Sequence, residues 1–176
     1  IRGAAAGGEV KTEALARSTL AKVLLEMRGD LSEAVGELEA VLRLTDDPND
    51  RGPALASLGN IRFREAWELK APPAEKLPEA ERLYGAALAA DPGRGAKDRD
   101  WVKTVHYSRA ALLMWAADAA PELAPDAVSR AVSSARAALE EDPEYATAHV
   151  MLGRALIAFG RRDDGIEEMR KSLALF

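Results

Sequence analysis

Hydrophobic residues recur along most of the chain with the period of an α-helix. The segment 31–42 shows this clearly, because its apolar residues fall on a single stripe of a helix. Glycine, proline and aspartate residues, which end helices, separate such segments from one another. Patterns typical of β-strands are nearly absent, so the chain is predicted to be all-α. Eight helices are expected, over residues 15–28, 31–44, 53–69, 78–90, 100–120, 126–140, 144–159 and 163–176.

Residues at the expected turns indicate where several of these helices begin and end. Gly29 has the conformational freedom to close the first helix, and Asp30 followed by Glu33 resembles a capping box that starts the second. Pro53 and Pro78 are expected in the first turns of the third and fourth helices, where a proline has no hydrogen bond to lose.

The second helix of each expected pair carries a motif of small and large residues. In the first pair it reads Ala34-x3-Leu38-x2-Val41. Equivalent motifs begin at Ala80, Ala131 and Gly165. A recurring motif of this kind indicates stacked repeats of one helix pair rather than an irregular bundle.

Two of the first helices add a large residue followed by a glycine, Leu58-Gly59 and Leu152-Gly153, where the glycine lets a paired helix approach closely. Together with the motifs above, these residues resemble the tetratricopeptide repeat (TPR) family. The resemblance covers about residues 12–176 and implies a right-handed α-solenoid of about four antiparallel helix pairs. The motif spacing equals the family's 34 residues only in the last repeat, which predicts insertions in the middle of the stack.

The N-terminal residues are rich in glycine and alanine, and we expect a flexible leader over residues 1–11 before a single domain over residues 12–176. The first residue is Ile1, which indicates a removed targeting segment or a trimmed chain. No apolar run has the length that predicts a membrane span. The localisation therefore stays open between cytoplasm and periplasm. The abundance of alanine, arginine and glycine resembles that of proteins from GC-rich bacterial genomes.

The composition and the scattered polar residues argue against several kinds of chemistry. A net charge of −5 is unfavourable for nucleic-acid binding, and the absence of cysteine excludes a thiolate nucleophile or a cysteine metal ligand. His149 is expected to pack in the core rather than bind a metal. The glycine-containing segment 93–97 lacks both the strand before it and the Lys-Ser/Thr ending of a phosphate loop. We therefore expect no enzymatic activity, no metal and no cofactor.

The TPR resemblance implies that the first helix of each pair lines a concave surface on which a partner binds. The residues expected to contact the partner are Asn60, Phe63, Arg64, Trp67, Lys103, His106, Tyr107, Met151 and Arg154. The same face is expected to include Thr19, Val23, Met27, Met114, Val150 and Ile157. This mixture of apolar side chains and isolated hydrogen-bond donors suits a peptide.

The function predicted from this surface is a scaffold or adaptor that binds a protein or peptide in a helical groove. The alternative is an accessory protein for transport or ligand binding, in which the insertions close the groove around a small molecule.

The last expected helix carries an apolar stripe of Ile166, Met169, Leu173 and Phe176. In a solenoid this face normally packs under a further helix. The stripe therefore predicts either that the natural chain continues or that this face packs against a partner or a second copy of the protein.

Overall fold

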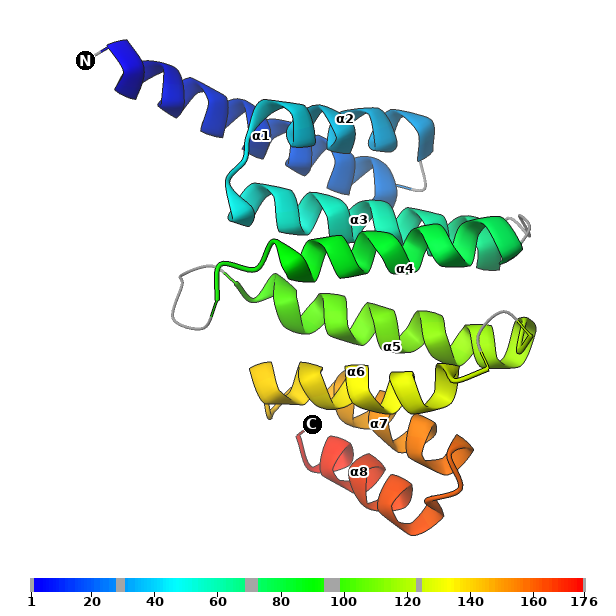
Figure 1. Ribbon diagram of the computed structural model, residues 1–176. Coiled ribbons are helices and arrows are strands. Elements are labelled where there is room, and N and C mark those ends of the chain that lie inside the picture. Colours follow the sequence, from blue (N-terminus) through cyan, green and yellow to red (C-terminus); the bar gives the residue numbers. More distant parts are fainter. Residues whose placement is uncertain (1, 28–30, 69–72, 94–98, 123–124, 176) are drawn as a thin grey trace.

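The computed structural model describes residues 2–27, 31–68, 73–93, 99–122 and 125–175, with the backbone alone for residues 2–7. Within these ranges it forms eight helices and no strand (Figure 1). The helices are α1 (Arg2–Glu26), α2 (Leu31–Leu44), α3 (Pro48–Trp67), α4 (Pro73–Ala89), α5 (Trp101–Ala119), α6 (Ala127–Glu141), α7 (Ala146–Ala158) and α8 (Arg162–Ala174). The prediction of an all-α chain of eight helices is confirmed.

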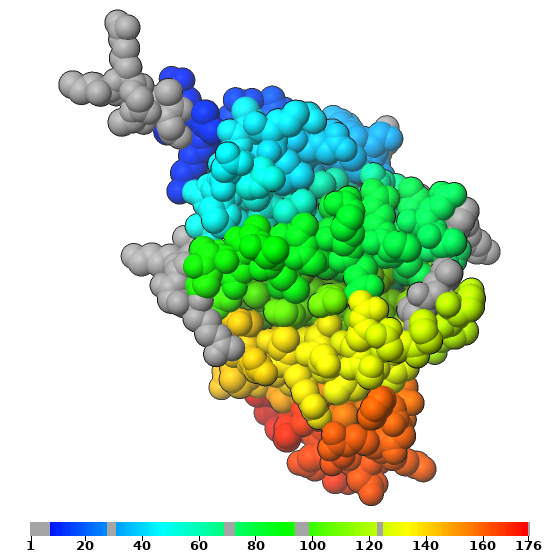
Figure 2. Space-filling model, viewed as in Figure 1, coloured from blue at the N-terminus to red at the C-terminus, as the bar shows by residue number. Residues whose placement is uncertain are grey.

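The helices are arranged as four pairs, in which α1 packs on α2, α3 on α4, α5 on α6 and α7 on α8. The second helix of each pair also packs on the first helix of the next pair. Figures 1 and 2 show the result: successive segments follow one another along a single axis, from α1 at one end to α8 at the other. The chain is therefore a solenoid rather than a closed bundle.

The two faces of the stack differ. The first helices contact one another, α1 with α3, α3 with α5 and α5 with α7, whereas in the described residues no second helix contacts another second helix. The first helices therefore lie closer together and form one face, which we call the inner face. The second helices spread apart on the other side, which we call the outer face.

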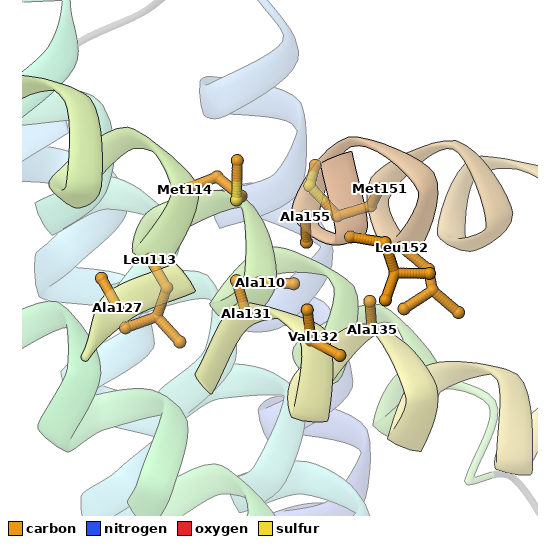
Figure 3. Close-up of a cluster of buried hydrophobic side chains, with 11 residues drawn as sticks. Ala110, Leu113, Met114, Ala127, Ala131, Val132, Ala135, Met151, Leu152 and Ala155 are labelled. Carbon is orange, nitrogen blue, oxygen red and sulfur yellow. The ribbon is translucent and has the colours of Figure 1, made fainter. Parts of the chain in front are cut away.

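Apolar side chains fill the space between the helices and join one pair to the next. One cluster of buried side chains draws residues from α5, α6 and α7, among them Leu113, Val132 and Leu152 (Figure 3). Two further clusters join the helices from α1 to α5 in the same way. Because each cluster includes side chains from at least three successive helices, the core continues from the first pair to α7.

Glycines in two pairs lie where no larger residue fits. A Cβ atom on Gly59 would come within 2.8 Å of the Tyr84 ring, and one on Gly153 would come within 2.7 Å of the carbonyl oxygen of Gly165. The sequence-based expectation that these glycines permit close approach of the paired helix is confirmed.

Several helices begin earlier than predicted. The Asp47 side chain accepts a hydrogen bond from the Asn49 backbone N–H (2.9 Å), which caps α3 at Pro48 and leaves Pro53 inside the helix. Pro78 likewise lies inside α4, because the buried side chains on either side of it, Leu77 and Ala80, hold the helix against its neighbours.

At the N-terminus α1 begins at Arg2, within the segment for which a flexible leader is expected. The alanines of residues 4–6 favour this extension, because alanine is the strongest helix former. The predicted turn at Gly29 and Asp30 lies outside the described residues. None of the helices within the described ranges combines the length and the hydropathy needed to cross a bilayer.

Candidate partner-binding groove

A groove of about 300 Å³ lies on the inner face, where three successive first helices meet. Its floor is α5, and its walls are the C-terminal end of α3 and part of α7. The lining residues are Phe63, Trp67, Tyr107, Ala111, Met114, Trp115, Asp118, Met151 and Arg154.

The helical period explains why α5 supplies most of this surface. Tyr107, Ala111, Met114 and Asp118 follow one another at intervals of three and four residues, so they share one face of the helix. Met114 and Met151 also belong to the buried cluster between α5 and α7, and Figure 3 shows both at the edge of that cluster. The groove floor therefore lies directly on the buried core.

Three aromatic rings follow one another along the α3 side of the groove. The rings of Phe63 and Trp67 are stacked at 6.1 Å with an angle of 25° between their planes, and Phe63 meets Trp115 at 5.9 Å and 59°. These separations are typical of favourable aromatic pairs. Trp67 is nevertheless 60% exposed, an unusual position for so large an apolar side chain.

Two opposite charges border the groove without forming ion pairs. Asp118 lies one turn after Trp115 on α5, and Arg154 lies one turn after Met151 on α7; both are exposed. Neither side chain has a hydrogen bond or a salt bridge to the part of the chain that the structure describes. Within the described residues, both charges are therefore left for a bound partner.

Comparisons with known proteins identify the architecture of the stack. No protein-family model matches the chain, and no curated protein matches it. Among solved structures, 18 chains match. One is described as the crystal structure of MamA; the match covers 92% of this chain and 77% of that chain, with a TM-score of 0.61 and 16% sequence identity.

MamA is a TPR-like helical protein. The fold of this chain is TPR-like. At 16% identity the similarity concerns the fold alone, so the groove must be interpreted from its own residues.

The TPR-like stack brings together five of the nine residues predicted to contact a partner. These five are Phe63, Trp67, Tyr107, Met151 and Arg154. The sequence analysis missed three lining residues, Ala111, Trp115 and Asp118. Helical spacing from Tyr107 could have placed Ala111 and Asp118 on the same helix face.

Asn60 has an internal role instead of lining the groove. The Tyr84 hydroxyl donates a hydrogen bond to Asn60 Oδ1 at 2.7 Å, so Asn60 satisfies the polar end of a buried ring. Burial raises the pKa of Tyr84, which keeps the hydroxyl protonated. Arg64 also lies outside the groove, where its Nε donates to Glu68 at 2.5 Å.

Lys103 is also engaged within the fold. Its Nζ lies 2.8 Å from Asp142 Oδ2 and 5.7 Å from the centre of the Tyr145 ring. The hydrogen bond from Lys103 lowers the pKa of Asp142 below its ordinary value. This pair joins α5 to the turn between α6 and α7. Arg99 makes a similar connection to Asp91 and Glu141.

His106 faces the outer side of α5 rather than the groove. It borders a separate hollow of about 180 Å³ together with Arg109, Arg130, Ser133 and Ser134, of which the last three belong to α6. Burial lowers the pKa of His106, and its Nδ1 has no hydrogen-bond partner within the described chain. The sequence analysis expected His106 on the groove side. Its spacing of three residues from Lys103 does not show which flank of α5 it occupies.

His149 packs in the core, as its position in the repeat predicted. One ring nitrogen, Nδ1, lies 2.7 Å from Glu168 Oε2, and the other, Nε2, lies 2.9 Å from the carbonyl oxygen of Pro143. The side chain thereby links the start of α7 to α8. In the described residues no group of three or more His, Asp or Glu side chains is placed to hold a metal ion.

The apolar stripe predicted on α8 is largely used inside the α7–α8 pair. Ile166 and Met169 are half-buried, and Met169 lies against the glycine contact between the two helices. Leu173 is 75% exposed. Phe176 lies outside the described residues.

Proposed function

We propose that this protein is a scaffold or adaptor that holds a partner protein or peptide in the groove of its inner face. The observation that carries the proposal is the continuous aromatic and methionine surface built by three successive first helices, with Trp67 exposed at its border. Exposed aromatic clusters supply much of the binding energy at protein interfaces. Met114 and Met151 form the apolar floor beneath these rings and are only 7% and 6% exposed.

The open form of the groove favours a polypeptide over an enclosed small molecule. Trp67, Asp118 and Arg154 border it and are all exposed. A small ligand is usually buried over most of its surface, which requires a closed cavity. A peptide can instead lie along the groove and remain partly in solvent.

We propose further that the protein performs no catalysis. The carboxylates whose pKa values are lowered, such as Asp91, Asp142 and Glu168, each pair with a basic side chain that joins one helix to another. Shifted pKa values of this kind accompany structural ion pairs as well as active sites, and each of these three carboxylates has a structural partner.

Site-specific photo-crosslinking tests the proposed function. A photoreactive phenylalanine analogue replaces Trp67 at the border of the groove or, as the control, Arg136 on the outer side of α6, where the side chain is exposed. In cells that make the natural protein, we expect a discrete crosslinked partner from position 67 that is absent from position 136.

A second change in the same protein connects the crosslink to the groove. Ala111→Phe fills the groove floor without removing a charged or aromatic contact, so it should abolish the crosslink from position 67. A crosslink that persists with Ala111→Phe, or that forms equally from position 136, would contradict the proposed function.

A further inference from the structure

The two walls of the groove differ in chemistry. The α3 side carries the rings of Phe63 and Trp67, which continue through Trp115 on α5. The α7 side carries Arg154. Since α3 and α7 are both in contact with α5 and not with each other in the described residues, the aromatic rings and the guanidinium stand on opposite walls.

Asp118 stands at an electrostatically unfavourable place for a carboxylate. It lies in the last turn of α5, where the unpaired carbonyl groups give the helix end a partial negative charge. The last turn of α5 contains no basic residue. Asp118 also has no ion pair within the described chain. A cation bound beside it would therefore be attracted by the side chain and by the helix end together.

The neighbouring aromatic rings add a second attraction for a cation. The face of an indole or phenyl ring carries partial negative charge and binds ammonium and guanidinium groups, with tryptophan the strongest of the three aromatic residues. Trp67 offers an exposed ring surface, and Trp115 lies one turn before Asp118. A long basic side chain is suited to both features, because its aliphatic stem packs on the rings while its charge reaches the carboxylate.

We propose that the groove recognises an arginine or lysine side chain of the partner. Its stem lies against Trp67 and Trp115, and its charge pairs with Asp118. An acidic group of the same segment pairs with Arg154 on the opposite wall and fixes the direction of the peptide. This inference rests on the proposed function, because it specifies what the same groove binds.

A purely apolar side chain fits the same surface less well. It would cover Asp118 and the end of α5 without providing a partner, and an unpaired charge that loses its water is strongly unfavourable. The charge arrangement therefore distinguishes a basic partner from an apolar one, although the aromatic rings alone would accept both.

Selection from a displayed library of random short peptides tests the inference on the full chain. Parallel selections use the wild type, Trp67→Ala, Asp118→Asn and the control Asp163→Asn, which removes an exposed carboxylate of α8 that does not line the groove. We expect the wild type and Asp163→Asn to enrich peptides that share an arginine or lysine at one position. Asp118→Asn should lose that preference, and Trp67→Ala should lose the peptides themselves.

A double-mutant cycle with one selected peptide measures the coupling energy between the basic residue of the peptide and Asp118. Replacing the basic residue of the peptide by glutamine should weaken binding roughly tenfold to the wild type, as for loss of a charge-assisted hydrogen bond. The same peptide change should have little effect on Asp118→Asn, because the partner charge is already absent. Asp118→Lys should reverse the preference and enrich acidic peptides.

The outcomes separate this inference from the proposed function. Peptides that depend on Trp67 but share no basic residue, or whose basic residue is not coupled to Asp118, would overturn the inference and leave the proposed function standing. A failure to enrich any peptide that depends on Trp67 would overturn both.

Discussion

The α7–α8 and α3–α4 pairs use the same sequence feature, a leucine followed by glycine, in two different ways. In α7–α8 the backbones meet directly, since a Cβ on Gly165 would lie 2.6 Å from the carbonyl oxygen of Gly153. In α3–α4 the space above Gly59 is filled by the ring of Tyr84. The first arrangement brings two helices into backbone contact, and the second places an aromatic ring between them.

The two pairs also differ in the length of their helices. The helices of the α7–α8 pair have 13 residues each, whereas α3 has 20 and α4 has 17. The last turns of the long α3 and α5 carry Trp67 and Asp118. The longer pairs therefore supply the aromatic rings and the carboxylate of the groove, while the α7–α8 pair adds the opposite wall with Met151 and Arg154.

The largest effect is expected from Gly153→Ala. The added methyl group meets the backbone of α8, which cannot rotate away as a side chain can, and we expect a loss of about 3 kcal/mol in the free energy of unfolding. Urea unfolding, with hydrogen exchange of the α8 amides, measures the effect. The control is Gly85→Ala, in open space within α4, which should stabilise the protein by about 0.5 kcal/mol. Equal effects of the two changes would contradict the backbone contact.

A smaller loss, about 2 kcal/mol, is expected from Gly59→Ala, because the obstacle is a side chain that can shift slightly. Because the added methyl group would meet the Tyr84 ring, the loss of stability should depend on that ring. In a double-mutant cycle, Gly59→Ala should cost much less when Tyr84 is already leucine. Thermal and urea unfolding of the wild type, the two single variants and the double variant measure the coupling energy between Gly59 and Tyr84. Additive effects would show that the ring is not the obstacle.

Tyr84→Phe isolates the polar end of the same ring. It removes the hydrogen bond to Asn60 while keeping the ring volume, so we expect a loss of about 1 kcal/mol. Asn60→Ala should have a similar effect, and the double variant should lose little more than either one. Binding at the groove should be unchanged in both variants, because neither residue lines it. Loss of binding with unchanged stability would instead indicate that Asn60 contacts the partner.

The smallest effect concerns pH and the α7–α8 pair. Burial raises the pKa of Glu168, but hydrogen bonds from Lys171 and His149 outweigh it and hold the pKa below its ordinary value of 4.5. A lowered folded-state pKa stabilises the protein above the unfolded-state value, and this stabilisation is lost as the pH falls through the folded-state value.

The free energy of unfolding of Glu168→Gln should therefore depend less steeply on pH than that of the wild type in the acidic range below 4.5. Urea unfolding at a series of pH values measures both slopes. Asp163→Asn, which also removes a carboxylate of α8 but one with no ion pair in the described chain, provides the control. Identical slopes for wild type and Glu168→Gln would contradict the proposed contribution of this carboxylate.

Part of the groove could be predicted from the sequence, because helical spacing reports which residues share a face. Phe63 and Trp67 are one turn apart, and both line the groove as expected. The same spacing could not place His106, since it lies at the flank of α5 and turns toward α6. It also gave no sign that Asn60 bonds to Tyr84, because the two residues are far apart in the chain and meet only when α3 packs on α4.

The sequence by itself determined the helices, their pairing and the stacked architecture, because these follow from local periodicity and from small residues recurring at fixed positions. It also indicated where helices end, although Pro53 and Pro78 show that buried neighbours can carry a helix through a proline. Only the tertiary structure decided which inner-face residues share one groove. That depends on how far each helix extends past its neighbour and on which charges already have partners within the fold. Within the described residues Asp118 and Arg154 have no such partner.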